Sequence, residues 1–80
     1  MNNTDIHIMV FGQLAEITGT ANLRLPFVAD SDLLKAALLA QFPAMGKVNF
    51  IIAVDKKPAT KNVTISSESV IALLPPFSGG

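Results

Sequence analysis

The residues with the most chemical promise lie at the C-terminal end, where residues 73–80 read LLPPFSGG. Pro75 and Pro76 each fix φ, and each favours an extended conformation in the residue before it, so the pair forms a stiff spacer. Gly79 and Gly80 have no Cβ, and they can therefore pass through a narrow channel in another protein. We expect the α-carboxylate of Gly80 to be the group that this segment delivers.

A carboxylate delivered in this way must be activated before it can react, most simply as a mixed anhydride with AMP. The adenylate can then be attacked by a sulfur donor or by an amine. We therefore interpret Gly80 as the reacting residue, with ATP used by a separate activating enzyme and no cofactor bound to this chain. Gly79 and Ser78 would thread into the partner, and the exposed aromatic ring of Phe77 would be buried by it.

Other side chains do not form a catalytic constellation. His7 is the only histidine, it lies in a predicted strand, and nothing near it in sequence would orient it as a general base, so a structural role is favoured. Asp30 and Asp32 are better explained as the cap and first turn of a helix than as metal ligands, and no metal site is expected. Lys56 and Lys57 are adjacent in a predicted turn, where exposure to solvent is the default and partner contact the alternative.

Composition narrows the class of protein. The chain has 80 residues, half of them hydrophobic, which allows one domain with a marginal core. Six basic residues balance six acidic ones, so no basic face is expected for nucleic acid. The absence of cysteine excludes disulfides and a thiolate nucleophile. No signal peptide or membrane-spanning run is indicated, and we expect a cytoplasmic protein without a membrane partner.

Two strands are predicted before residue 28. Residues 5–11 alternate, with one face formed by Ile6, Ile8 and Val10 and the other by His7, Met9 and Phe11. Gly12 ends this strand, and residues 13–19 form a short helical turn that stops at Gly19. Residues 21–27 alternate again, with Leu23, Leu25 and Phe27 on one face. Pro26 cannot donate to a ladder, so the second strand is expected at an edge, paired with the first.

The best helix is predicted over residues 31–42. Asp30 or Ser31 would cap it, and Pro43 would stop it. Residues 48–54 form a third strand that is apolar enough to be central, and residues 55–58 turn the chain. Residues 59–65 are a weaker strand or an irregular segment. Residues 70–74 form the last strand, which leads directly into the prolines.

A single helix packed across a mixed sheet is the economical way to bury these faces. The sequence therefore predicts an α+β, β-grasp (ubiquitin-like) domain over residues 1–74, with the last strand parallel to the first at the sheet centre. Residues 75–80 would form a flexible, extended C-terminal tail. The expected core includes the side chains of Ile8, Val10, Leu34, Leu38, Ile52 and Ile71.

The order of elements and the ending PPFSGG resemble the family of molybdopterin synthase small subunits, which are β-grasp sulfur carriers. The resemblance covers nearly the whole chain. The segment VFGQLAEITGT is similar to the family's apolar strand, Leu-x-Glu turn and glycine, and FIIAVD is similar to its third strand. The most specific likeness is VIALLPPFSGG, which follows the family pattern of an apolar strand and then Pro-Pro-x-x-Gly-Gly.

The resemblance implies that an adenylyltransferase similar to ubiquitin-activating proteins adenylates Gly80, and that a sulfur donor converts it to a thiocarboxylate. The tail would then enter the large subunit of a heterotetramer and give sulfur to a cyclic pyranopterin precursor in molybdenum cofactor biosynthesis. Catalytic side chains are expected on the large subunit, which leaves this chain as its non-catalytic sulfur-donor subunit. The residues expected to bind this partner are Phe77, Pro76, Pro75, Leu74, Phe11 and Met9.

Three positions depart from the family pattern. The family often has a basic residue where Ala15 stands and an asparagine where Asp55 stands. Its acidic Asp-Gly turn before the last strand is replaced by Ser67 and Glu68. None of these positions touches the tail, so they bear on partner contact rather than on function.

Several alternatives remain open at this point. The chain could carry sulfur for the thiazole of thiamine or for thiolated tRNA, although the thiamine-pathway carriers usually lack the Pro-Pro pair. It could instead be a ubiquitin-like modifier joined to lysines, or a binding module whose Gly-Gly is incidental. The outer side chains His7, Met9 and Phe11 could form a docking face or a second layer of core under a loop.

Overall fold

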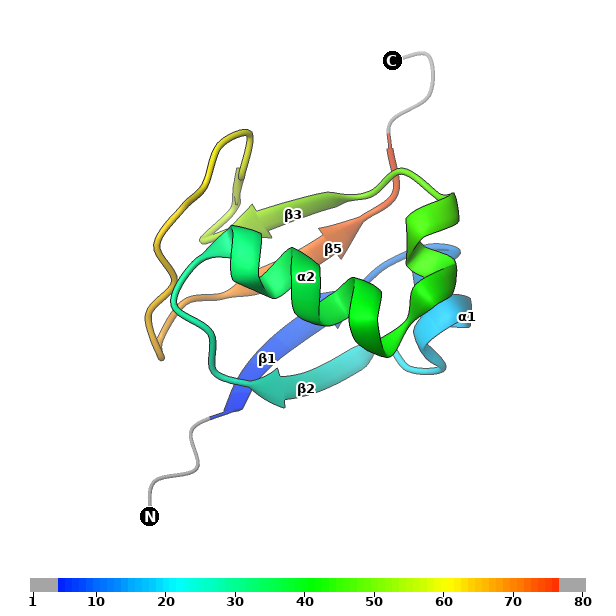
Figure 1. Cartoon of the computed structure of the whole chain (residues 1–80), viewed down its shortest axis with the longest axis horizontal. Coiled ribbons are helices and arrows are strands. Elements are labelled where there is room, and N and C mark those ends of the chain that lie inside the picture. Colours follow the sequence, from blue (N-terminus) through cyan, green and yellow to red (C-terminus); the bar gives the residue numbers. More distant parts are fainter. Residues whose placement is uncertain (1–4, 77–80) are drawn as a thin grey trace.

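The computed structural model describes residues 5–76 of the chain (Figure 1). Five strands, two α-helices and one short 3₁₀ helix lie in this range. In chain order they are β1 (Asp5–Val10), α1 (Leu14–Thr18), β2 (Asn22–Pro26), α2 (Ser31–Gln41), η1 (Pro43–Lys47), β3 (Ile51–Val54), β4 (Lys57–Pro58) and β5 (Ile71–Leu74).

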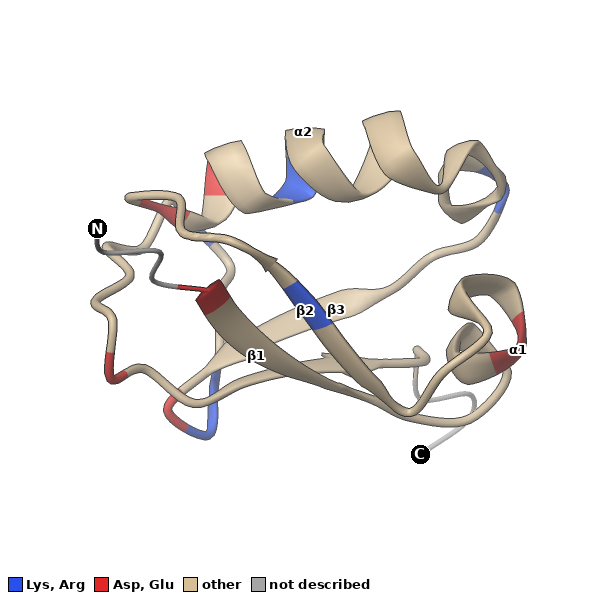
Figure 2. Cartoon of the chain, turned by 90° about the horizontal axis from the view of Figure 1, so that it is seen from below, with Lys and Arg blue, Asp and Glu red and all other residues tan. Residues whose placement is uncertain are grey.

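The strands form one mixed sheet in the order β2-β1-β5-β3-β4. β1 and β2 are antiparallel, β1 and β5 are parallel, and β3 is antiparallel to both β5 and β4. The last strand thus lies beside the first at the centre of the sheet, as the sequence predicts. α2 crosses one face of this sheet (Figures 1 and 2). The architecture is the predicted β-grasp fold, and β2, the strand that ends in Pro26, is an edge strand as expected.

The core lies between the sheet and α2. In β1 the side chains alternate between buried and exposed, so that Ile6, Ile8 and Val10 face α2. Leu34 and Leu38 are fully buried on the facing side of the helix. All six residues predicted for the core are buried, and they belong to one cluster with Leu14, Leu23, Leu25, Met45, Val54, Ile65 and Leu73.

The start of α2 is fixed by side chains. The Asp30 carboxylate accepts a hydrogen bond from the backbone N–H of Leu33 at 2.9 Å, which is the predicted N-cap. The hydroxyl of the buried Ser31 accepts from the N–H of Val63 at 2.9 Å, and the Ser31 N–H donates to the Val63 carbonyl at 2.8 Å. These bonds tie the irregular segment of residues 59–70 to the helix.

Three local expectations differ from the structure. Residues 43–47, between the predicted helix and the predicted third strand, form the 3₁₀ helix η1, and the third strand begins at Ile51 rather than at residue 48. Lys57 and Pro58 belong to the short strand β4, and the turn before them is made by Asp55 and Lys56 alone. Phe27 is 41% exposed, because the chain leaves the sheet after Pro26 and the alternation of β2 ends there.

The burial of α2 predicts unequal effects of the same substitution at two of its leucines. Leu38→Ala should lower the free energy of unfolding by roughly 2–5 kcal/mol, because it leaves a cavity in the core. Leu33→Ala is the matched control: Leu33 lies on the same helix but is 51% exposed, and its loss should be within about 0.5 kcal/mol. Urea denaturation of both variants measures the difference. Equal losses would contradict the observed orientation of α2.

Candidate functional site

The described part of the tail begins at the centre of the sheet. β5 lies between β1 and β3, ends at Leu74, and is followed directly by Pro75 and Pro76. Leu74 and Pro75 are half-buried, and Pro76 is exposed. The remaining predicted tail residues Phe77, Ser78, Gly79 and Gly80 lie outside the described residues. The structure therefore gives the base of the tail and the surface around it.

The sheet face opposite α2 carries the side chains that alternate with the core. Met9 is 40% exposed and Phe11 is 45% exposed, so the alternative of a second core layer is wrong for these two residues. The register places Met9 beside Ala72 and Leu74 beside Ile51, and the Phe11 N–H donates to the Leu73 carbonyl at 3.0 Å. The neighbouring side chains Met9, Phe11, Ile51, Ala72 and Leu74 form what we call the apolar patch.

The apolar patch surrounds the base of the tail and contains no charged residue. Figure 2 shows that the charged positions gather in loops, helices and strand ends, with Arg24 on β2 and Asp5 at the start of β1. Leu74 belongs to the patch and is followed directly by Pro75, the first residue of the tail. A protein that binds the tail near its base therefore contacts Met9 and Phe11 as well. The structure thus brings together three of the predicted partner-binding residues: Met9, Phe11 and Leu74.

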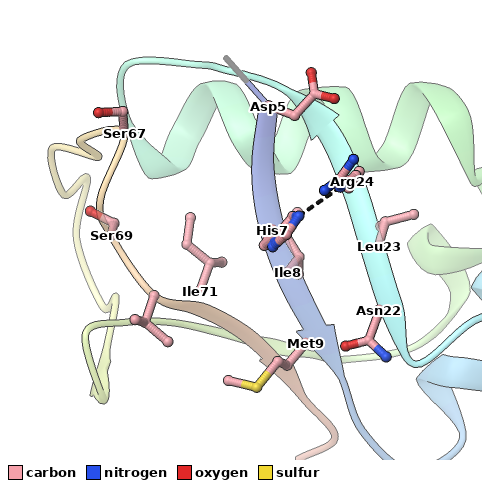
Figure 3. A pocket seen from close by; sticks show the side chains of 11 residues that line it. Asp5, His7, Ile8, Met9, Asn22, Leu23, Arg24, Ser67, Ser69 and Ile71 are labelled. Atoms are coloured by element: carbon pink, nitrogen blue, oxygen red, sulfur yellow. Dashed lines mark hydrogen bonds between the residues drawn. The ribbon is translucent and has the colours of Figure 1, made fainter. Parts of the chain in front are cut away.

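The other end of the same face carries polar and charged side chains among apolar ones. Side chains of β1 and β2 and the segment before β5 line an open hollow of about 660 Å³, seen in Figure 3. Arg24 Nε donates a hydrogen bond to His7 Nε2 at 2.6 Å, across two residues that are directly opposite in the β1–β2 register. A general base is normally oriented by a carboxylate or a carbonyl, whereas here the imidazole faces a guanidinium. This arrangement supports the structural interpretation of His7.

The acidic residues considered as metal ligands lie at the start of α2, Asp30 as its N-cap and Asp32 in its first turn. Asp30 caps α2, and the Asp32 N–H is held by the side-chain oxygen of Asn62 at 2.9 Å. Within residues 5–76, no group of three or more His, Cys, Asp or Glu side chains is placed to hold a metal ion. In the same range, no helix is long and apolar enough to cross a membrane.

Asp55 and Lys56 form the turn between β3 and β4, both with positive φ (52° and 71°). Two consecutive residues in this conformation make the tight hairpin turn in which Asp and Asn are favoured. Asp55 Oδ1 also accepts from the Val70 N–H at 2.9 Å, and the Asp55 N–H donates to the Val70 carbonyl at 2.7 Å. The departure from asparagine at this position therefore keeps both the turn and the anchor before β5.

The other two departures differ in exposure. Ala15 is half-buried in α1 and packs against the core, and Glu68 is exposed in the turn of residues 66–69. In that turn the Ser66 N–H donates to Ser69 Oγ at 3.0 Å, and the Ser69 N–H donates to the Ser66 carbonyl at 3.1 Å. Ser66 and Ser69 thus hold this turn closed through their hydrogen bonds with each other.

Sequence reasoning missed one contact at the base of the tail. Gly12 has a φ of +62°, and an added Cβ there would lie 3.0 Å from Cγ of Pro75. The sequence predicts that the first strand ends at Gly12. The approach of Pro75 to Gly12 depends on the register of the parallel pairing of β1 with β5, which the sequence pattern does not specify. The His7–Arg24 bond was missed for the same kind of reason, because it follows from the register of β1 and β2.

Comparison with known proteins agrees with this geometry. The molybdopterin synthase sulfur carrier subunit of Arabidopsis thaliana is 25% identical over 83 residues, which cover 99% of this chain and 86% of that protein. The solution structure of the small archaeal modifier protein 1 from Methanosarcina acetivorans has a TM-score of 0.75 at 19% identity, with all of both chains covered. The crystal structure of the Haloferax volcanii protein of that name has a TM-score of 0.71 at 25% identity, covering 95% of this chain and 99% of that one.

A family model also matches most of the chain. The model of the ThiS family matches residues 8–80, from the middle of β1 to the Gly-Gly ending. It thus includes the sheet, the helix α2 and the whole tail motif. This chain belongs to the ThiS family and is a ubiquitin-like sulfur carrier.

Proposed function

We propose that this chain is the sulfur carrier of molybdopterin synthesis, with a body of residues 1–74 and a tail of residues 75–80. The observation that carries the proposal is the position of β5. This strand runs from the centre of the sheet into the two prolines, beside the apolar patch, in which Met9 and Phe11 are exposed. The likeness of the Arabidopsis protein over 99% of the chain supports the same pathway.

The proposed chemistry takes place at the Gly80 carboxylate. An activating enzyme joins this carboxylate to AMP from ATP and releases pyrophosphate. A sulfur donor then attacks the acyl carbon and displaces AMP, which leaves a thiocarboxylate. In the last step the sulfur passes to a cyclic pyranopterin precursor, and water returns the carboxylate. None of these steps needs a catalytic side chain from this protein, and we assign those side chains to the large subunit of the synthase.

The same surface serves both partners in this proposal. The activating enzyme and the large subunit each have to receive the tail, so each must approach the sheet where Leu74 leaves it. The apolar patch lies at that place, and burying it excludes water from the base of the tail. We assign partner binding to Met9, Phe11 and Leu74 of the patch and to Pro75, Pro76 and Phe77 of the tail. Ser78 and Gly79 thread into the partner.

A second candidate is a ubiquitin-like protein modifier, which the likeness to the two archaeal modifier structures favours. The adenylate would then be attacked by a lysine amine of a target protein, and an amide bond would replace the thiocarboxylate. Both functions use the same carboxylate and the same activating step. They differ in the acceptor, so they are separated by looking for the product.

Deleting the gene tests the pathway. We expect the activity of molybdenum enzymes to disappear, because no dithiolene is made, and we expect supplied cofactor to restore it. Molybdenum-enzyme activity in extracts is the measurement. Unchanged activity together with lysine adducts that end in Gly-Gly would favour the modifier. Loss of thiamine synthesis or of tRNA thiolation would assign the sulfur to another acceptor.

The position of the carboxylate should matter more than any side chain. One residue added after Gly80 would move the carboxylate by up to about 3.6 Å, and a misplacement of about 1 Å can cost on the order of 100-fold in rate. The added residue, deletion of Gly80, or Gly79→Val should therefore abolish adenylation while the circular dichroism and melting temperature stay unchanged. Intact mass first establishes Gly80 as the last residue of the protein used.

The product is identified on the unmodified chain. Incubation with the activating enzyme, ATP and a sulfur donor should add the mass difference between sulfur and oxygen, and tandem mass spectrometry should place it on Gly80. If the extended variant is converted at the rate of the wild-type protein, the C-terminal carboxylate is not the reacting group.

Docking should depend on aromatic residues at the tail end of the sheet. Phe77→Ala and Phe11→Ala should each weaken binding to the large subunit by about 2 kcal/mol, because each removes a large apolar anchor. Phe27→Ala is the control: Phe27 is exposed to a similar extent but follows Pro26, at the end of the sheet away from the tail. Isothermal titration calorimetry measures the three dissociation constants. A loss at Phe27 equal to that at Phe11 would remove the apolar patch from the interface.

A further inference from the structure

Two glycines within residues 5–76 have positive φ, and they differ in what lies beside them. Gly19, with a φ of +80°, ends α1, and an added Cβ there would meet nothing within 4 Å. Gly12, with a φ of +62°, joins β1 to α1, and an added Cβ would lie 3.0, 3.6 and 3.8 Å from Cγ, Cδ and Cβ of Pro75. The ring of Pro75 therefore rests on the backbone of Gly12.

Both sides of this contact are held in place. The Phe11 N–H donates to the Leu73 carbonyl at 3.0 Å, which extends the β1–β5 ladder up to the contact. On the other side, the Gly12 carbonyl accepts from the Ala15 N–H at 3.1 Å, at the start of α1. The backbone of Gly12 is thus fixed in position. A heavy atom added to Gly12 closer than about 3 Å to the ring of Pro75 would have to displace that ring.

The position of the Pro75 ring matters because the chain beyond it is stiff at its base. Pro75 and Pro76 each fix φ, so the orientation of the first ring is passed to the second. Five residues follow Pro75, and together they reach at most about 18 Å. A tilt at this base changes the direction in which the chain leaves Pro76, and a misplacement of the reacting group by about 1 Å is enough to slow a reaction by on the order of 100-fold.

We propose that Gly12 is a positioning residue for the tail. The ring of Pro75 packs against the backbone of Gly12, which has no side chain, and this contact sets the direction in which the tail leaves the body. The proposal rests on the proposed function only in taking the Gly80 carboxylate as the reacting group. In this proposal Gly12 acts through its contact with Pro75.

Gly12→Ala and Gly19→Ala form a matched pair that tests this role. Each places a Cβ on a residue with positive φ, so each should lower the urea midpoint, and Gly12→Ala should lower it further because its Cβ also crowds Pro75. Only Gly12→Ala adds a contact with Pro75. The probe is the activating enzyme with ATP, and pyrophosphate release is measured. Gly12→Ala should lower kcat by about 10-fold or more with little change in KM, whereas Gly19→Ala should match the wild-type protein.

A second pair of variants, with asparagine in place of alanine, allows the same comparison if the alanine variants fold poorly. Asparagine tolerates positive φ better than alanine and brings the same Cβ. Gly12→Asn and Gly19→Asn should therefore fold better than the alanine variants and still differ in kcat. The Pro75→Ala background shows whether the effect passes through the ring. In that background Gly12→Ala should have little further effect, so that the two substitutions are not additive.

An NMR measurement tests the contact without any chemistry. Gly12→Ala should shift the ring carbons of Pro75 and the amide of Phe77, and Gly19→Ala should leave them in place. Equal kcat values for the two alanine variants, additive effects with Pro75→Ala, or unchanged Pro75 signals would each overturn the positioning role. A wild-type protein that is not adenylated would instead overturn the proposed function, and the NMR comparison would still decide the contact.

Discussion

The parallel pairing of β1 with β5 is the constraint on which the rest of the structure depends. It joins the first strand to the last, and Ile8 beside Ile71 and Val10 beside Leu73 are among the most buried side chains. The centre of the sheet forms only when β5 pairs with β1 on one side and β3 on the other. The tail is therefore rooted in the part of the molecule that opens last. Under the proposed function, the reacting carboxylate is thus carried by a segment that starts from a rigid base.

Much of this fold could be predicted because its signals are local. The alternation in β1, the Asp30 cap and Pro43 each act within a few residues, and each lies where the pattern placed it. The errors came where tertiary context decides. The segment PAMGK coils into η1 because Met45 is drawn into the core, and Phe27 is exposed because the chain has left the sheet.

The candidate site divides in the same way. The chemistry proposed for the tail stays a prediction from residue types, because it rests on two prolines, two glycines and a carboxylate. The outward face of β1 followed from alternation. The contacts of Gly12 with Pro75, of His7 with Arg24 and of Asp55 with Val70 could not be predicted, since each joins residues far apart in the sequence. Such contacts depend on the strand register, which single-sequence patterns do not specify.

The two edge strands have one further consequence. β2 ends in Pro26, and β4 consists of Lys57 and Pro58. A proline has no N–H to offer, and a very short edge strand with a lysine gives an incoming strand little to pair with. Both edges thus discourage one sheet from adding to another, which is the usual route to aggregation of small β proteins. A carrier can then display an apolar patch to its partners without polymerising through its own strands.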